Sequence, residues 1–221
     1  MEWSLLRPLS PEVRTRITSA ARPRRYARGD VVFHEGDPGD TLHLIRSGRL
    51  AVRVSTDDGE SATLRILRPG DAFGELSLLH PNEDHLRSAT ITALEPVETL
   101  VLPRAAFESL RASHPQVERL LVSLLAERVE QLSQRLLEAL YVGVERRVLR
   151  RLLELVEIYG DAQGEQTTVI PLTQDDLAGL AGARRPTVNQ VLQRLAGQGV
   201  VVLKRGNIVV TQPAELRRRA A

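Results

Sequence analysis

The sequence of 221 residues contains no cysteine. That absence excludes disulfides, thiolate zinc sites, cysteine nucleophiles and cysteine-held iron–sulfur clusters. Aromatic residues make up only 3% of a chain that is 42% hydrophobic, so aliphatic side chains must fill its cores. No apolar run approaches the roughly 20 residues that span a bilayer, and the first residues lack the basic and apolar regions of a signal peptide. We therefore expect a soluble, cytoplasmic protein with no membrane partner.

Lysine is almost absent as well, because Lys204 is the only one and every other strong cation is an arginine. The charges are unevenly divided: residues 1–144 carry a net charge of −2, and residues 145–221 carry +4. A basic C-terminal third is typical of a protein that binds a polyanion such as DNA. Ordinary surface charge gives the same bias, so the charge alone leaves both interpretations open.

The N-terminal half contains many turn sequences between short apolar runs. Residues 9–20 predict a short amphipathic helix with Ser10 at its N-cap and Pro11 at its first position. Short runs of β-branched and aliphatic residues follow, separated by glycine, proline and aspartate turns, at 31–33, 42–45, 50–54, 64–67, 89–94 and 97–102. Many short strands at regular spacing predict an antiparallel β-roll or jelly roll.

Residues 114–141 have a different period. Apolar side chains recur at alternating steps of three and four, with no glycine or proline inside the run, at Val122, Leu125, Val129, Leu132, Leu136 and Ala139. This heptad seam predicts a long helix that pairs with a second copy of the chain. A helix buried within a monomer would show the same pattern. A second stripe could pack on the roll through Leu120, Leu121, Leu124 and Leu137.

The C-terminal third predicts a winged helix. Gly143 is placed as a hinge before a helix that ends near Tyr159. Thr173 is a good N-cap for the next helix, and Gly182 is placed to end it. A second helix follows from about residue 184 to 197, and residues 200–210 form a β-hairpin. We thus predict an α+β protein with a roll at 1–113, a dimerisation helix at 114–142 and a winged helix-turn-helix domain at 143–221.

One stretch carries the chemistry. In Phe73-Gly74-Glu75-Leu76, the glycine allows the backbone to approach a ligand closely, and the carboxylate can accept hydrogen bonds from ribose hydroxyls. Downstream, the guanidinium of Arg87 and the hydroxyl of Ser88 can hold a phosphate. This set, followed by the helix-turn-helix pattern, resembles the CRP/FNR family of transcription regulators, in its cyclic-AMP receptor branch.

The resemblance implies a role for each residue of the ligand site. Glu75 would bind the ribose, Arg87 and Ser88 the cyclic phosphate, and the amides around Gly74 and Leu76 would complete the cradle. The ungapped alignment of the long helix places Arg128 near Glu75 and Ser133 at the adenine amine. Leu132 departs from the family, because it stands where a threonine contacts adenine, and a lost hydroxyl changes base selectivity.

The resemblance also places the second helix of the helix-turn-helix in the major groove. Arg185 matches an arginine that reads guanine, the commonest specific contact. Thr187 and Arg184 would contact phosphate, and Gln190 replaces a base-reading arginine. The target half-site should therefore differ from that of the receptor branch. Asn189 and Arg194 are further candidates for DNA contacts.

The function implied is a homodimeric, sequence-specific DNA-binding regulator, controlled by cyclic AMP and acting at a palindromic operator with RNA polymerase as a partner. The polymerase surface would be the 160–166 loop, by family position. A ligand-independent regulator with a vestigial pocket is the alternative. No catalytic motif points to an enzyme. His80 and His85 stand five residues apart in a loop, which is poor ligand spacing, so we expect neither metal nor haem.

Overall fold

The computed structural model describes residues 3 and 6 and residues 8–55, 61–79, 86–160 and 167–220. The chain divides into two compact units, residues 1–61 with 65–131 and residues 62–64 with 132–221. Strands dominate the first unit and helices the second, which confirms the predicted α+β class. The predicted boundaries at 113 and 142 stay predictions, because the division falls within the long helix.

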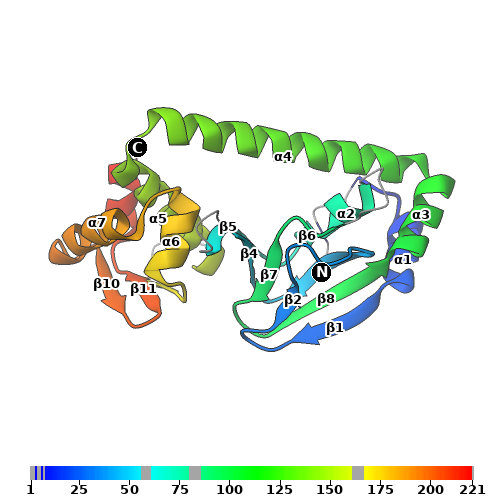
Figure 1. Cartoon of the computed structure of the whole chain (residues 1–221), viewed down its shortest axis with the longest axis horizontal. Helices are drawn as coiled ribbons and strands as arrows, with labels where there is room; N and C mark the ends of the chain where they lie inside the picture. Colours follow the sequence, from blue (N-terminus) through cyan, green and yellow to red (C-terminus); the bar gives the residue numbers. More distant parts are fainter. Residues whose placement is uncertain are drawn as a thin grey trace. The chain divides into compact units, whose positions relative to one another are not determined.

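Within the described ranges, eight strands between residues 22 and 103 form two four-stranded sheets (Figure 1), in the orders β1-β8-β3-β6 and β2-β7-β4-β5. The pairs β1–β8, β2–β7, β3–β6, β3–β8 and β4–β7 run antiparallel. Their bounds are β1 (Arg22–Tyr26), β2 (Val31–Phe33), β3 (Thr41–Ser47), β4 (Leu50–Ser55), β5 (Ser61–Leu67), β6 (Ala72–Phe73), β7 (Thr90–Ala93) and β8 (Val97–Pro103). All six predicted runs lie on strands of these sheets.

A buried cluster joins the two sheets face to face. Ile45, Phe73 and Val97 come from one sheet and meet Leu67 and Ile91 from the other. Burying the alternate side chains of both sheets in one apolar layer is what stabilises such a sandwich. The tight turn between β3 and β4 depends on Gly48, whose φ is +79° and whose added Cβ would lie 2.4 Å from the Pro96 carbonyl oxygen.

The first strand has no counterpart in the predictions. β1 reads Arg-Pro-Arg-Arg-Tyr, its side chains are almost all exposed, and no apolar alternation marks it. It is a strand because β8 supplies a continuous antiparallel partner, from Arg22 opposite Val101 to Tyr26 opposite Val97. It lies at the edge of its sheet.

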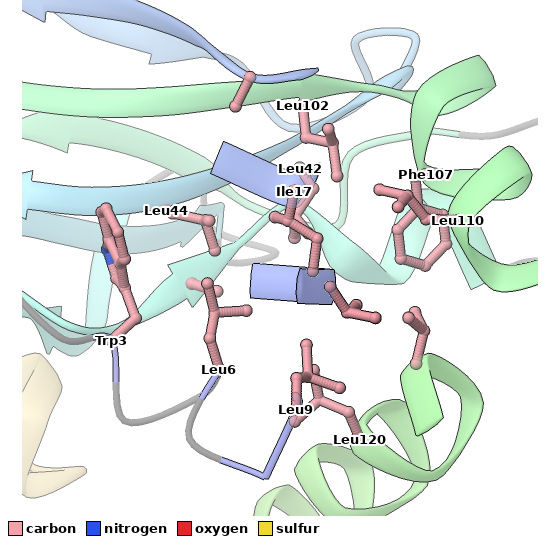
Figure 2. Close-up of a cluster of buried hydrophobic side chains, with 14 of the residues drawn as sticks. Trp3, Leu6, Leu9, Ile17, Leu42, Leu44, Leu102, Phe107, Leu110 and Leu120 are labelled. Carbon is pink, nitrogen blue, oxygen red and sulfur yellow. The ribbon is translucent and has the colours of Figure 1, made fainter. Parts of the chain in front are cut away.

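Helices close one end of the roll around a second apolar cluster (Figure 2). They are α1 (Pro11–Ala20), α3 (Arg104–Ser113) and the start of α4 (Pro115–Tyr141). Trp3 anchors the N-terminal segment, because its indole Nε1 donates to the Ile45 carbonyl at 2.9 Å. Ser10 stands at the N-cap of α1 as predicted, but its side chain does not cap the helix; its hydroxyl accepts from the Gln116 amide instead.

The long helix exposes most of the predicted seam, although Leu125 is half-buried. Val122, Val129, Leu132 and Leu136 are each about 60–65% exposed on the single chain. On another face, Leu120 and Leu121 are buried in the cluster of Figure 2, as the second stripe predicts. Leu137 is 56% exposed and belongs to the second unit, so its place in that stripe stays a prediction.

The second unit contains a helix-turn-helix and a three-stranded sheet in the order β10-β11-β9. The N-terminus of the short helix α6 (Gln174–Ala181) is fixed by a capping box, in which Thr173 and Asp176 bond each other's backbone amides, and Gly182 ends that helix at φ +57°. The elements are α5 (Val144–Tyr159), β9 (Thr168–Ile170), α6 (Gln174–Ala181), α7 (Arg185–Gly197), β10 (Val201–Lys204), β11 (Asn207–Val210) and α8 (Pro213–Ala220). The predicted winged helix is confirmed, with β9 and α8 in addition.

Across the described parts of the chain, none of the helices combines the length and the apolar character that crossing a membrane requires.

Candidate functional sites

A cavity of about 60 Å³ lies in the roll where β6 runs into the short helix α2 (Glu75–Leu79). Its walls include six of the seven ligand residues that the sequence predicted: Gly74, Glu75, Leu76, Arg87, Ser88 and Arg128. Apolar side chains such as Phe33, Val52 and Ile91 complete them. The seventh residue, Ser133, is an exposed residue of α4 in the second unit. The roles of all seven stay predictions.

Gly74 lets two segments of the chain meet. Its φ is +85°, and a Cβ at this position would lie 2.6 Å from Nη1 of Arg87 and 2.7 Å from the Thr41 carbonyl oxygen. No other residue type fits such a position without displacing the guanidinium or the strand. The glycine is therefore required by the close approach of Arg87 to the backbone.

Arg87 is only 5% exposed, and most of its donors are satisfied by the protein. Nη1 donates to the Thr41 carbonyl at 3.0 Å, to the Gly74 carbonyl at 3.2 Å and to Ser77 Oγ at 3.0 Å. Nη2 donates to Thr41 Oγ1 at 2.7 Å, and the guanidinium lies 4.1 Å from the centre of the Phe33 ring. Burial lowers the pKa of Arg87 from its ordinary value, and the carboxylate of Asp40 opposes that shift.

Nε is the one nitrogen of the Arg87 guanidinium that has no acceptor among the described residues, and it is buried. An unpaired buried donor costs roughly 1–3 kcal/mol. An anionic group in the adjoining cavity would remove that cost, because a guanidinium edge with two free N–H groups matches a phosphate. The donor set thus fits a phosphate-bearing ligand.

Glu75, the first residue of α2, supplies the opposite charge. Its carboxylate side chain is only 4% exposed, and Oε1 lies 3.1 Å from Nη2 of Arg128, which is 30% exposed. The structure therefore brings Arg128 of α4 to Glu75, as the alignment predicted. An ion pair compensates the desolvation of the buried carboxylate, and it links α4 to the cavity wall.

The predicted DNA-contacting residues lie on one side of α7. Arg184 is the N-cap residue and Arg185 the first helical residue. Most of the candidate side chains are exposed, whereas Asn189 is half-buried; the set is Arg184, Arg185, Thr187, Asn189, Gln190 and Arg194. The opposite face is buried through Val188, Val191, Leu192 and Leu195. An amphipathic helix held in this way presents its polar side outward.

Two of these arginines are paired with carboxylates of the same unit. Nη1 of Arg185 lies 3.2 Å from Oδ2 of Asp175, in the first turn of α6. Nη2 of Arg194 lies 3.0 Å from Oε2 of Glu145 on α5. All four side chains are more than half exposed. Such solvated pairs are weak and exchange partners readily.

Arg185 also borders a groove of about 290 Å³ in the second unit. The groove runs between the start of α6 and the turn of the wing, where Lys204 and Arg205 add two more cations. Gly206 completes that turn at φ +72°. A helix N-terminus flanked by three cations forms a surface suited to a phosphate backbone.

Both halves of the chain match known families. Residues 23–114 match the cyclic nucleotide-binding domain, and residues 146–219 match the Crp-like helix-turn-helix domain. The chain is 32% identical over 213 residues to the CRP-like cAMP-activated global transcriptional regulator of Mycobacterium tuberculosis, covering 96% of this chain and 94% of that protein. The chain belongs to the CRP/FNR family of transcription regulators.

Two Thermus thermophilus comparisons agree with this membership. The cyclic AMP receptor protein of that organism is 35% identical, over 96% of this chain and 94% of the relative. A crystal structure of the T. thermophilus catabolite activator protein covers 98% of this chain and 97% of its own, at 34% identity and a TM-score of 0.56. This CRP/FNR protein is therefore a DNA-binding transcription regulator with a cyclic nucleotide-binding domain, and not an enzyme.

The residues that hold Arg87 were missed at the sequence level. Thr41 accepts two of its hydrogen bonds, and His43 contacts the Thr41 hydroxyl. Both stand 44 or more residues before Arg87 on a strand that reads as ordinary core, so no local pattern could have marked them. Among the described residues of this CRP/FNR protein no cluster of metal-ligating side chains occurs; His80 and His85 lie outside the described residues.

Proposed function

We propose that this protein is a homodimeric transcription regulator whose affinity for a palindromic operator is controlled by 3′,5′-cyclic AMP bound in the roll. The observation that carries the proposal is Arg87, which lines the same cavity as Glu75 and whose buried Nε has no acceptor among the described residues. The cyclic-AMP receptors that resemble this chain over 94% of their length support the choice of ligand.

Each polar group of the cavity has a counterpart on a cyclic nucleotide. The free N–H edge of Arg87 and the hydroxyl of Ser88 bind the cyclic phosphate, and the amides of Gly74 and Leu76 assist. The carboxylate of Glu75 accepts from the ribose hydroxyl. On α4, Arg128 lies beside Glu75 at the ribose, and Ser133 contacts the adenine amine.

The small cavity suggests how the ligand is sensed. About 60 Å³ is well below the 300–1,000 Å³ of ordinary ligand pockets. A nucleotide must therefore widen the cavity and compete with the Arg128–Glu75 pair. Because Arg128 belongs to α4, ligand binding changes what holds that helix to the roll. Coupling of this type is typically worth about 1–3 kcal/mol.

The exposed seam of α4 supports the dimer. Four branched aliphatic side chains, Val122, Val129, Leu132 and Leu136, are more than half exposed on the single chain. A parallel pair of these helices would bury them and set two α7 helices about one DNA turn apart, roughly 34–36 Å. Sedimentation should show a dimer for the wild type and a monomer for the double variant Val129→Glu/Leu136→Glu. RNA polymerase is a further partner, through the 160–166 loop, of which residues 161–166 lie outside the described residues.

The direct test is a titration of operator DNA, selected from a random pool, with and without cyclic AMP. We expect cyclic AMP to tighten operator binding about 5- to 150-fold for the wild type, and we expect Arg87→Ala and Ser88→Ala to need a much higher cyclic AMP concentration for the same effect. Arg68→Ala is the matched control, since it removes an exposed arginine of the roll outside the cavity. Equal operator affinity with and without the nucleotide in the wild type would eliminate ligand control.

A ligand-independent regulator is the second candidate. The narrow cavity and Leu132, in the position of the family's adenine-contacting threonine, both favour it. Calorimetry with cyclic AMP and cyclic GMP separates the two candidates. Heat from neither nucleotide, together with tight operator binding, would establish the ligand-independent function.

A further inference from the structure

The guanidinium of Arg87 is held at one edge by a single residue. Thr41, the first residue of β3, accepts from Nη1 through its carbonyl at 3.0 Å and from Nη2 through its hydroxyl at 2.7 Å. With Thr41 on the Nη1–Nη2 edge, the remaining N–H of Nη2 and the unpartnered Nε–H share the neighbouring edge. That edge is the fork with which arginine binds a phosphate through two bonds.

His43 lies two residues further along β3, on the same face of the strand. Its Nε2 is 3.1 Å from Oγ1 of Thr41, and the residue is only 4% exposed. The imidazole stacks on Phe73 with ring centres 4.7 Å apart and lies edge-on to Phe33 at 5.9 Å. The ring is therefore fixed by packing on both sides.

The imidazole is neutral in this position. Burial, with the charges of Arg87 and Arg24, lowers the pKa of His43 to about 3. A neutral ring can accept a hydrogen bond at Nε2. Because Arg87 donates to the Thr41 oxygen, the hydroxyl proton of Thr41 is free to donate to that nitrogen. The donors then run in one direction, from Arg87 through Thr41 to His43.

The imidazole carries a free-energy cost that an apolar ring of the same shape would avoid. Nδ1 of His43 is buried without a partner among the described residues. An apolar aromatic ring would fill the space between Phe33 and Phe73 without leaving such a group unpaired. The imidazole is useful where it stands because it contacts the Thr41 hydroxyl.

We propose that Thr41 and His43 are positioning residues, which orient Arg87 so that its Nε–Nη2 edge faces the anionic group of the effector. The proposal rests on the proposed function of the cavity and adds to it a support that reaches the ligand only through Arg87. Removing that support should weaken the binding of a charged phosphate when Arg87 is present. In a variant that lacks Arg87, the same change should leave the affinity unaltered.

The test is a double-mutant cycle read by calorimetry, with 3′,5′-cyclic AMP as the probe. Thr41→Val removes the hydroxyl and keeps the carbonyl, and it should weaken binding about tenfold, the size of one hydrogen bond to a charged group. His43→Phe keeps the stack and should weaken binding about threefold. Thr41→Ser restores the hydroxyl and should bind within about twofold of wild type. In an Arg87→Ala background, Thr41→Val should change the affinity by less than about twofold.

Thr92→Val is the matched control, a half-buried threonine of β7 that does not line the cavity; its affinity should equal that of the wild type. Thermal unfolding of each variant reports folding separately. The proposal is overturned if Thr41→Val binds like wild type, or if it weakens binding equally with and without Arg87. A wild type that binds no cyclic AMP would overturn the proposed function and this inference together.

Discussion

The two units treat arginine in opposite ways. In the roll, Arg87 is 5% exposed and touches four acceptors of the protein. In the winged helix, Arg185 is 67% exposed at the side chain and touches one carboxylate. The protein holds a buried cation in the orientation that binds one small anion, and the cation loses its hydration in return. A solvated cation keeps its freedom and meets a long polyanion, whose affinity comes from many such contacts.

The largest expected effect tests the buried side of this comparison. Arg128→Ala leaves the carboxylate of Glu75 buried without its ionic partner. Breaking a buried pair in this way costs about 3–5 kcal/mol, which should appear as a lower free energy of unfolding in urea. The double variant Glu75→Gln/Arg128→Ala should recover most of that loss. A single variant as stable as the wild type would show that Glu75 is better solvated than its burial indicates.

Substituting the exposed Arg185 should change the affinity for DNA and leave the free energy of unfolding almost unaltered. Arg185→Ala should cost about 1–3 kcal/mol on the selected operator and little on random DNA. Its free energy of unfolding should stay within about 0.5 kcal/mol of wild type, because the side chain is mostly solvated. Band-shift titrations on both DNAs provide the measurement. A uniform loss on both would make Arg185 a phosphate contact.

His43 gives the roll a pH dependence that the winged helix lacks at a comparable site. Its folded pKa of about 3 lies below the unfolded value of 6.5, so the unfolded state binds a proton that the folded state does not. Stability should therefore fall as the pH decreases from 6.5 towards 3, by about 1.4 kcal/mol per pH unit from this group. Between pH 5 and pH 4, urea unfolding should show that His43→Phe loses about 1.4 kcal/mol less free energy of unfolding than the wild type. Identical losses would mean that the imidazole is protonated in the folded protein.

The smallest effect concerns the carboxylate beside Arg185. Asp175→Asn removes one exposed ion pair, worth at most about 1 kcal/mol. It also removes a negative charge from the groove that contains Lys204 and Arg205. Random DNA should bind slightly more tightly, with a steeper dependence on salt. Glu157→Gln, the same change at an exposed site on α5, is the control; equal effects in the two variants would exclude a local role for Asp175.

The same contrast explains what could be predicted from the sequence. Gly74, Glu75, Arg87 and Ser88 belong to two short stretches with recognisable chemistry, and they line one cavity. The capped helices of the second unit were equally readable, because Thr173 and Gly182 are local signals. Local patterns report local structure well.

The rest depends on contacts between distant segments. β1 carries no apolar alternation and is a strand only because β8 pairs with it. Thr41 and His43 support Arg87 across more than 40 positions of sequence, which no periodicity reveals.

The composition of β1 has a further consequence for solubility. An edge strand offers free backbone groups to any strand from another molecule, and stacking of that kind begins aggregation. β1 places Arg22, Arg24 and Arg25 around Pro23 at the edge of its sheet. The proline withholds an amide, and the arginines of two approaching copies would repel one another. Both features of β1 oppose edge-to-edge pairing of two copies of the roll.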